Sequence, residues 1–332
     1  MSKSSEALGK KLVEAGNQIM PLLEELFPVD REDFLSAPFW HHMGTGGKRI
    51  RPALCLLCCE ELGGRQEEAL PFAAAVEILH NMLLVHDDVE DGDKVRRDAP
   101  TVWVKFGVEN AVNLGDYMLG RAYSVIQRSP VEGNTTLRLM AAFTSAYEHT
   151  CQGQARDLNQ RGKADLSVED YLETVRLKTG DYLALGMVGG AIIAGLSAEG
   201  VDRIRELGSN MGPAFQVRDD VIDLTRGKGR GGALGNDIRE GKPSILYAHA
   251  LSEADTADRN RLLKIMRRDR PDTSDDDVQW VISLYEKLGS IEFARSTAER
   301  LVEESYETIE TIPVDNKQFF RTVARFMAER TK

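Results

Sequence analysis

Apolar side chains recur about every three to four residues along most of this chain, which is the period of an amphipathic helix. No stretch of useful length alternates apolar and polar residues as a half-buried strand does. The pattern predicts an all-α fold, and a single domain over residues 1–332 is the simplest organisation because no repeat or linker-like segment interrupts the chain. The expected helices span about 5–26, 48–62, 66–90, 108–127, 134–158, 168–178, 181–196, 199–224, 241–251, 256–268, 275–288, 290–309 and 315–330.

Composition narrows the classes of partner. The chain is 42% hydrophobic, which suffices for a sizeable core, and its formal charge of -11 argues against a nucleic-acid partner. Any charge on a substrate must therefore be met by local basic groups or by metal. Cys55, Cys58 and Cys59 lie in one apolar helical run, and no His or further Cys completes a zinc site. We expect buried core thiols in a reducing cytoplasm.

Neither the N-terminal segment nor the apolar runs predict a membrane protein. The first sixteen residues are polar and lack the core of a signal peptide. The best candidate for a span, residues 187–196, is short and glycine-rich, well below the roughly 18 residues that a span needs. We expect a soluble, cytoplasmic protein with no membrane span.

Two aspartate clusters of the form DDxxD carry most of the functional information: Asp87-Asp88-Val89-Glu90-Asp91 and Asp219-Asp220-Val221-Ile222-Asp223. Each follows an apolar helical stretch, so its three carboxylates project from one helix face and repel one another unless a cation neutralises them. Mg²⁺ is typically shared between carboxylates and substrate phosphates. One such cluster is as easily a solvated acidic helix end. Two of them favour a site that holds several Mg²⁺ ions around a diphosphate.

Basic residues accompany both clusters. The segment Gly46-Gly47-Lys48-Arg49-Ile50-Arg51-Pro52 places glycines and cations at a helix start, which is a typical diphosphate-binding arrangement. His80 precedes the first cluster by about two helical turns, and a lone His there is more often a core residue than a phosphate donor. Further chemistry-bearing residues are Arg96, Arg97, Lys178, Thr179, Gln216 and Lys242. The glycine-rich stretch 226–235 predicts a mobile loop after the second cluster.

The order of these motifs resembles the trans-isoprenyl diphosphate synthases, also called polyprenyl synthetases. GGKRIRP, EILHNMLLVHDDVEDGDKVRR with APTVW, KTG, FQVRDDVID and GNDIREGKPS follow one another at the family's spacing, over about residues 44 to 250. The resemblance implies a helical bundle of the isoprenoid synthase type around a central cavity. It also implies a homodimer, and the joining of isopentenyl diphosphate to an allylic diphosphate with Mg²⁺ as cofactor.

The resemblance also assigns residues to roles. The allylic diphosphate would be held through Mg²⁺ by the two aspartate clusters and directly by Arg96, Lys178 and Lys242. Isopentenyl diphosphate would be held by a second basic set, and two dipoles would stabilise an allylic cation. The metal set is Asp87, Asp88, Asp91, Asp219, Asp220 and Asp223; the second basic set is Lys48, Arg51, His80 and Arg97; the dipoles belong to Thr179 and Gln216.

Two positions depart from the family's pattern. Asp98 stands where the family usually has glycine, and it brings a negative charge near a phosphate site. Gly232 stands where the family carries a lysine in a GKxxGxD segment, so one phosphate contact is in doubt unless Lys228 or Arg230 replaces it.

Residues before the first aspartate predict product length, because in this family the growing chain runs down that helix. Met82 and Leu83 occupy the deciding turn, without the aromatic ring that fifteen-carbon enzymes usually present. Ile78 and Leu79, one turn deeper, are bulky. We expect the twenty-carbon geranylgeranyl diphosphate, with fifteen or twenty-five carbons as alternatives, and with Tyr117 and Met118 as other candidates for the floor.

Two other functions fit less well. A class I terpene cyclase would replace the second DDxxD with a different triad and would not need the second basic set. A catalytically silent regulatory subunit would typically lose aspartates from one cluster, and both are intact here. The charged segment 252–277 has no functional interpretation from the sequence.

Overall fold

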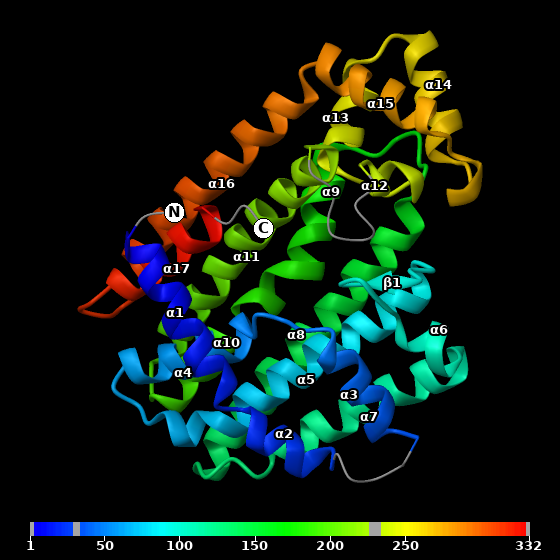
Figure 1. Ribbon diagram of the computed structural model, residues 1–332. Coiled ribbons are helices and arrows are strands. Elements are labelled where there is room, and N and C mark those ends of the chain that lie inside the picture. Colours follow the sequence, from blue (N-terminus) through cyan, green and yellow to red (C-terminus); the bar gives the residue numbers. More distant parts are fainter. Residues whose placement is uncertain (1–2, 29–33, 226–233, 330–332) are drawn as a thin grey trace. The chain divides into compact units, whose positions relative to one another are not determined.

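The computed structural model describes residues 3–28, 34–225 and 234–329, and nearly all of its regular structure is helical (Figure 1). The chain divides into two compact units. Unit 1 comprises Met1–Ala146, Ala184–Arg205 and Thr311–Phe326, and unit 2 comprises Tyr147–Leu183, Glu206–Glu310 and Met327–Lys332. Helices α8 (Gly133–Gln160), α10 (Asp181–Ile193), α11 (Ala198–Thr225), α16 (Ser290–Thr311) and α17 (Gln318–Glu329) contribute residues to both.

Unit 1 is built around helix α5 (Gln66–Glu90), which packs against α4 and α7 (Figure 1). Every residue from Phe72 to Leu79 is buried, because a central helix needs apolar side chains all round rather than on one stripe. The other elements of this unit are α1 (Lys3–Asn17), α2 (Met20–Leu26), α3 (Ser36–Gly44), α4 (Ile50–Glu61), α6 (Val102–Phe106), α7 (Val108–Ile126), and the hairpin strands β1 (Val95–Arg96) and β2 (Ala99–Pro100).

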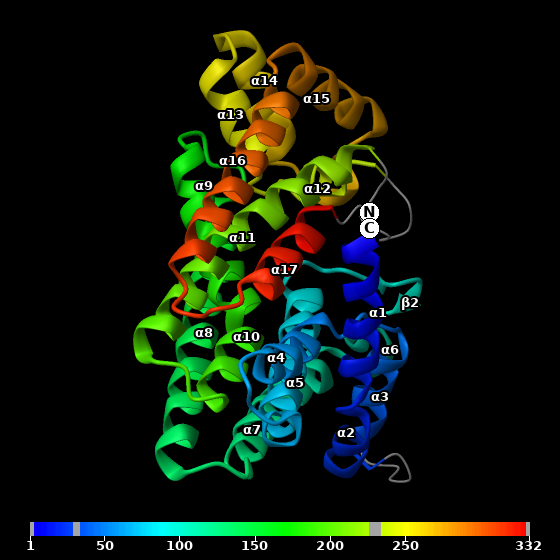
Figure 2. The ribbon, with the colours of Figure 1, turned by 90° about the vertical axis from the view of Figure 1, so that its left-hand side faces the viewer.

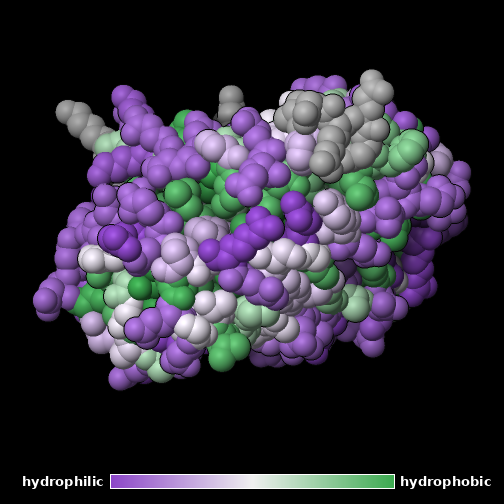
Figure 3. Space-filling model, turned by 90° about the horizontal axis from the view of Figure 1, so that it is seen from below, coloured by the Kyte–Doolittle hydropathy of each residue, from purple (hydrophilic) through white to green (hydrophobic). Residues whose placement is uncertain are grey.

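Helix α5 is the one described helix that is long and apolar enough to cross a membrane by length and composition. Most of its apolar window, 67%, is buried inside the protein, so α5 is a core helix. Hydrophobic side chains on the face shown in Figure 3 lie scattered among hydrophilic ones.

Glycines in α10 let this helix approach α4 closely within unit 1. A Cβ atom on Gly186 would lie 2.3 Å from the Arg51 carbonyl oxygen, and one on Gly190 would lie 2.4 Å from that of Cys55. These distances are far below van der Waals contact, so only glycine fits. The glycine-rich run around residues 187–196 therefore serves helix packing.

Unit 2 has its own hydrophobic core, centred on Val217, Tyr247, Leu262, Val281 and Leu301. Helices α13, α14 and α15 gather in it (Figure 2). Two of its helices begin at capping boxes, in which Ser167 and Ser274 each bond reciprocally with the aspartate three residues on. The remaining elements are α9 (Val168–Val175), a π-helical turn (Arg176–Gly180), α12 (Asn236–Arg239), α13 (Ile245–Glu253), α14 (Thr256–Met266), a 3-10 turn (Arg270–Asp272) and α15 (Asp275–Lys287).

The all-α prediction is confirmed, and the differences are local. The helix expected over 5–26 is two helices, because the chain turns at residues 18–19 before Pro21. The short helices α3, α6 and α12 were not predicted, because they have too few turns to show a helical period in the sequence. Cys55, Cys58 and Cys59 are buried thiols as expected, and burial raises the pKa of Cys59 to about 11.

Candidate functional site

The first aspartate cluster forms the end of α5, and its three carboxylates differ in exposure. Asp87 and Asp91 are partly exposed, whereas Asp88 is 1% exposed. Arg96 Nε donates to Asp88 Oδ1 over 2.6 Å, and Arg96 Nη2 donates to Asp87 Oδ2 over 3.4 Å. Burial raises the pKa of Asp88 to about 6, although the Arg96 guanidinium opposes this shift. Asp88 therefore belongs to the framework that fixes Arg96 beside the cluster.

A two-residue hairpin returns Arg96 to the cluster. Strands β1 and β2 pair Val95 with Pro100 and Arg96 with Ala99, which leaves Arg97 and Asp98 as the turn. Both turn residues have positive φ, 51° and 63°, as a tight hairpin of this kind requires. The Trp103 indole and the Thr101 hydroxyl donate to the Asp93 carbonyl over 2.8 and 2.9 Å and so fix the base of the hairpin.

The replacement of the family's glycine by Asp98 has a backbone consequence as well as an electrostatic one, since glycine would adopt the positive φ at this position without strain. We expect Asp98→Gly to raise the free energy of unfolding by about 0.5–1 kcal/mol, the gain from relieved strain being partly offset by a more flexible unfolded chain. Asp98→Asn is the control, because it removes the charge and keeps a side chain that tolerates positive φ about as well as aspartate does. Denaturant unfolding checks both variants, and an equal gain in both would attribute the effect to charge instead.

The second basic set gathers within unit 1. Burial, together with the charges of Arg51 and Arg97, holds the pKa of His80 well below its usual range. Arg97 Nη1 lies 3.1 Å from the position of a Cβ on Gly47, so the guanidinium packs on the glycine turn before α4. Lys48 is exposed beside it. Arg49 begins α4 in a left-handed conformation, with φ of 46°.

Three polar residues beneath this basic set were not anticipated from the sequence. Glu77 is 4% exposed and accepts from Asn81 Nδ2 over 3.1 Å, while burial raises its pKa against the opposing charges of Arg51, Arg49 and Arg97. His42 is also buried, and burial with the charges of Arg96 and Arg97 lowers its pKa to about 3. The signal that could have identified these residues in the sequence is their polar character within an otherwise apolar helical run.

The second cluster lies on α11 in unit 2, and two of its three carboxylates are buried. Asp219 is partly exposed, whereas Asp220 and Asp223 are 2% and 0% exposed. Asp220 accepts from the Tyr171 hydroxyl over 2.6 Å, from Gln216 Nε2 over 3.0 Å and from the Ile245 amide over 3.4 Å. Gln216 is therefore held by the cluster that it precedes.

Lys178 and Thr179 lie in the π-helical turn, a conformation that is frequent at functional sites. Lys178 Nζ lies 3.0 Å from Asp157 Oδ2, and Asp157 is a buried carboxylate that the sequence reasoning missed. A Cβ on Gly153 would lie 2.3 Å from the Lys178 amide nitrogen, so α8 supports the turn by direct backbone approach.

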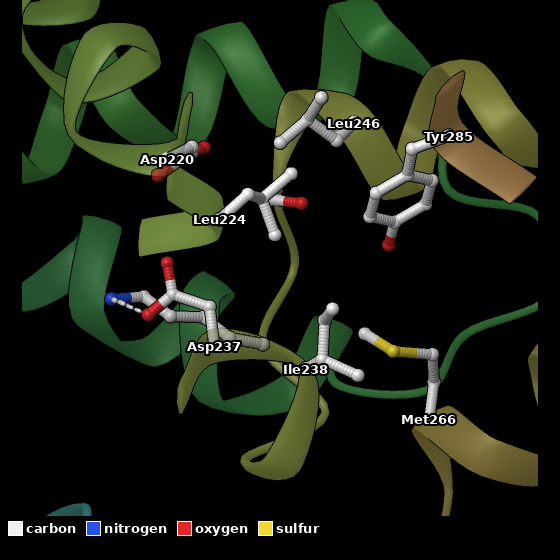
Figure 4. A pocket seen from close by; sticks show the side chains of 9 residues that line it. Asp220, Leu224, Asp237, Ile238, Leu246, Met266 and Tyr285 are labelled. Atoms are coloured by element: carbon white, nitrogen blue, oxygen red, sulfur yellow. Dashed lines mark ion pairs between the residues drawn. The ribbon is translucent and has the colours of Figure 1, made fainter. Parts of the chain in front are cut away.

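Lys242 shares a small cavity in unit 2 with Asp220, Asp237 and Tyr285, and Figure 4 shows the ion pair at Asp237 as a dashed line. Lys242 Nζ lies 3.8 Å from Asp237 Oδ1. Gly232 and its suggested replacements Lys228 and Arg230 lie outside the described residues. No group of three or more His, Cys, Asp or Glu side chains is already gathered for a metal ion in the described parts of the chain.

Comparison with known proteins identifies the family. The polyprenyl synthetase family model matches residues 32–285. The chain is 33% identical to a geranylgeranyl diphosphate synthase of Saccharolobus solfataricus, covering 88% of this chain and 89% of the relative. It is also 33% identical to a geranylfarnesyl diphosphate synthase of Aeropyrum pernix, covering 90% and 95%.

Solved structures agree. The crystal structure of geranylgeranyl pyrophosphate synthetase from Pyrococcus horikoshii matches with a TM-score of 0.88 and 33% identity, over 98% of this chain and 99% of that one. Geranylgeranyl pyrophosphate synthase from Corynebacterium glutamicum, complexed with isoprenyl diphosphate and magnesium, matches with a TM-score of 0.82 and 26% identity, over 99% of both chains. The chain belongs to the polyprenyl synthetase family and is a prenyltransferase, a short- to medium-chain trans-prenyl diphosphate synthase.

Proposed function

We propose that the protein condenses isopentenyl diphosphate with dimethylallyl, geranyl or farnesyl diphosphate and makes mainly geranylgeranyl diphosphate, as one catalytic domain over 1–332 in the cytoplasm. The observation that carries this proposal is the pairing of acidic and basic groups in each unit. Arg96 is fixed on Asp87 and Asp88, and Lys242 lies with Asp220 around one cavity. Such pairs suit a substrate that is bound through metal and cations together.

Mg²⁺ is the proposed cofactor, and the exposure of the carboxylates suggests how the aspartates divide the work. Asp87, Asp91 and Asp219 are partly exposed, so we assign them direct contact with the metal ions. Asp88, Asp220 and Asp223 are buried among protein donors and would orient their neighbours. Bound Mg²⁺ would neutralise the leaving diphosphate, so that the allylic C–O bond ionises.

The protein's own groups then have separate tasks. Arg96, Lys178 and Lys242 would bind the allylic diphosphate, and Asp157 holds the Lys178 ammonium in place before substrate arrives. Lys48, Arg51, His80 and Arg97 would bind isopentenyl diphosphate, whose double bond attacks the allylic cation. The Thr179 and Gln216 dipoles would stabilise that cation. The released diphosphate would take the proton, so no side-chain nucleophile is needed.

Product length rests on the α5 turn before the cluster. Met82, Ile78 and Leu79 are buried, and so is Met118 on α7. Tyr117, by contrast, is 36% exposed and lies edge-on to Phe27, so we place the floor at the buried residues instead. The chain is 33% identical both to a twenty-carbon and to a twenty-five-carbon synthase, so the proposal of a twenty-carbon product rests on the α5 residues, with geranylfarnesyl diphosphate as the alternative.

The test is an assay of product length with Mg²⁺, isopentenyl diphosphate and each of the three allylic primers. The wild-type protein is expected to make a dominant twenty-carbon product. Met82→Ala is expected to lengthen that product by at least one five-carbon unit, because the methionine side chain no longer blocks the growing tail. Met82→Phe should shorten it. Met187→Ala, at another fully buried methionine of unit 1, controls for general loosening of the core. No product from any primer would favour a silent subunit, and an unchanged distribution would remove Met82 from the floor.

A homodimer is part of the proposal. Val104 on α6 and Val108 and Val112 on α7 are 44%, 44% and 42% exposed, and the last two lie four residues apart and so form an apolar stripe on one face of α7. Such a stripe on a helix face is typical of an interaction surface, and a second copy of the chain is the partner that the family implies. A sedimentation mass of twice 36.9 kDa is expected.

A further inference from the structure

The segment that carries Lys242 is fastened to the second aspartate cluster at its beginning. The Gly235 amide donates to the Asp223 carbonyl over 3.1 Å, and the Asp237 amide donates to Asp223 Oδ2 over 3.1 Å. The Lys242 amide then donates to the Asp237 carbonyl over 2.9 Å. A chain of three hydrogen bonds therefore runs from the cluster to Lys242.

The middle of this segment is held by the charged region to which the sequence assigned no function. Arg239 Nη1 donates to the Thr273 carbonyl over 2.7 Å, and the same guanidinium forms an ion pair with Asp275. Next to it, the Glu240 carboxylate lies 3.5 Å from Arg270 Nη1. Residues 270–275 thus bind two consecutive side chains of the Lys242 segment, Arg239 and Glu240.

The backbone of the Lys242 segment also has little freedom. Gly241 has φ of 62°, and a Cβ there would lie 2.2 Å from the Met266 carbonyl oxygen at the end of α14. The α14 end is itself fixed, because Arg267 Nε donates to the Gly162 carbonyl over 2.9 Å. The residue directly before Lys242 is therefore wedged against an anchored helix end.

Burial separates these contacts from ordinary surface ion pairs, which contribute little to stability. The side chains of Arg239 and Glu240 on the Lys242 segment are 18% and 2% exposed, while their partners Asp275 and Arg270 are 93% and 35% exposed. In the Arg295–Glu292 pair both side chains are exposed, at 56% and 76%. A charge-assisted hydrogen bond from a mostly buried guanidinium is directional and resists displacement.

The geometry points to Arg239 and Glu240 as positioning residues that act on the allylic diphosphate through Lys242, with residues 266–275 as their anchor. This inference rests on the proposed function, in which Lys242 binds that diphosphate. The anchor fixes the backbone on both sides of Gly241, so that the Lys242 ammonium stays at the second cluster with less freedom to lose when substrate binds. The charged segment 252–277 thereby acquires a role in substrate binding.

The experiment is a double-mutant cycle between Arg239→Ala and Lys242→Ala in the full-length protein. Arg239→Ala is expected to raise KM for the allylic substrate about tenfold while KM for isopentenyl diphosphate stays unchanged. In the Lys242→Ala background it should add no further rise, because its effect passes through that lysine. Arg261→Ala is the matched control. Its guanidinium lies over the Trp280 ring in the same region and takes no part in the anchor.

Several outcomes overturn the inference: an unchanged KM, an equal rise in KM for both substrates, or additive effects in the cycle. Glu240→Gln repeats the test if Arg239→Ala does not fold. Calorimetric binding of inorganic diphosphate with Mg²⁺ separates this inference from the proposed function, because it requires no turnover. An inactive wild-type protein whose diphosphate affinity still falls about tenfold in Arg239→Ala contradicts the proposed reaction alone. An active wild-type protein whose affinity is indifferent to Arg239 contradicts the inference alone.

Discussion

Asp87→Ala is expected to lower kcat by at least roughly a thousandfold, the scale on which loss of a fixed electrostatic partner of a leaving group reduces rates. Asp87 is the partly exposed carboxylate that Arg96 fixes at the end of α5, so its removal takes away both a proposed metal ligand and an anchor for that guanidinium. Steady-state rates over a series of Mg²⁺ concentrations measure the effect. The concentration needed for half-maximal rate should also rise.

The control for Asp87 is Asp202→Ala, which breaks the exposed Asp202–Arg205 pair. Its removal is expected to leave kcat unchanged, because exposed pairs contribute at most about 1 kcal/mol to stability and this one lies outside the proposed site. A wild-type rate in Asp87→Ala would exclude this carboxylate from the metal site.

Gly186→Ala is expected to lower the free energy of unfolding by about 3 kcal/mol, at the upper end of the usual cost of overpacking. The added methyl group would meet the Arg51 carbonyl at 2.3 Å, and a backbone atom in a packed helix cannot turn aside as a side chain does. Displacing α4 also moves Arg51, so KM for isopentenyl diphosphate should rise. Denaturant unfolding and steady-state kinetics check the two effects.

Gly133→Ala is the matched control for Gly186. Gly133 begins α8, and a Cβ there would meet no atom within 4 Å. Its free energy of unfolding should change by less than about 1 kcal/mol. Equal losses in the two variants would show that the α4–α10 approach does not need glycine.

The sequence predicted the fold class and most helices, because the helical period can be read directly from long amphipathic or apolar runs. It could not distinguish the aspartates within one cluster. Residues i, i+1 and i+4 share a helix face, and only tertiary packing decides that Asp88 and Asp220 turn inward. The π-helical turn at Lys178 could not be predicted either. Its backbone hydrogen bonds join residues five apart, and no particular residue composition accompanies them. Asp157 was missed because one acid on a long polar helix resembles a solvated position.

The thiol arrangement has a practical consequence. Cys55, Cys58 and Cys59 are buried with raised pKa values, whereas Cys151 is exposed on α8. A thiol-reactive fluorophore or spin label should therefore attach at one place in the native protein without any engineered cysteine. That place is two residues from Gly153, the backbone on which the Lys178 turn rests. The natural chain thus offers a single spectroscopic reporter beside the turn that is proposed to receive the allylic diphosphate.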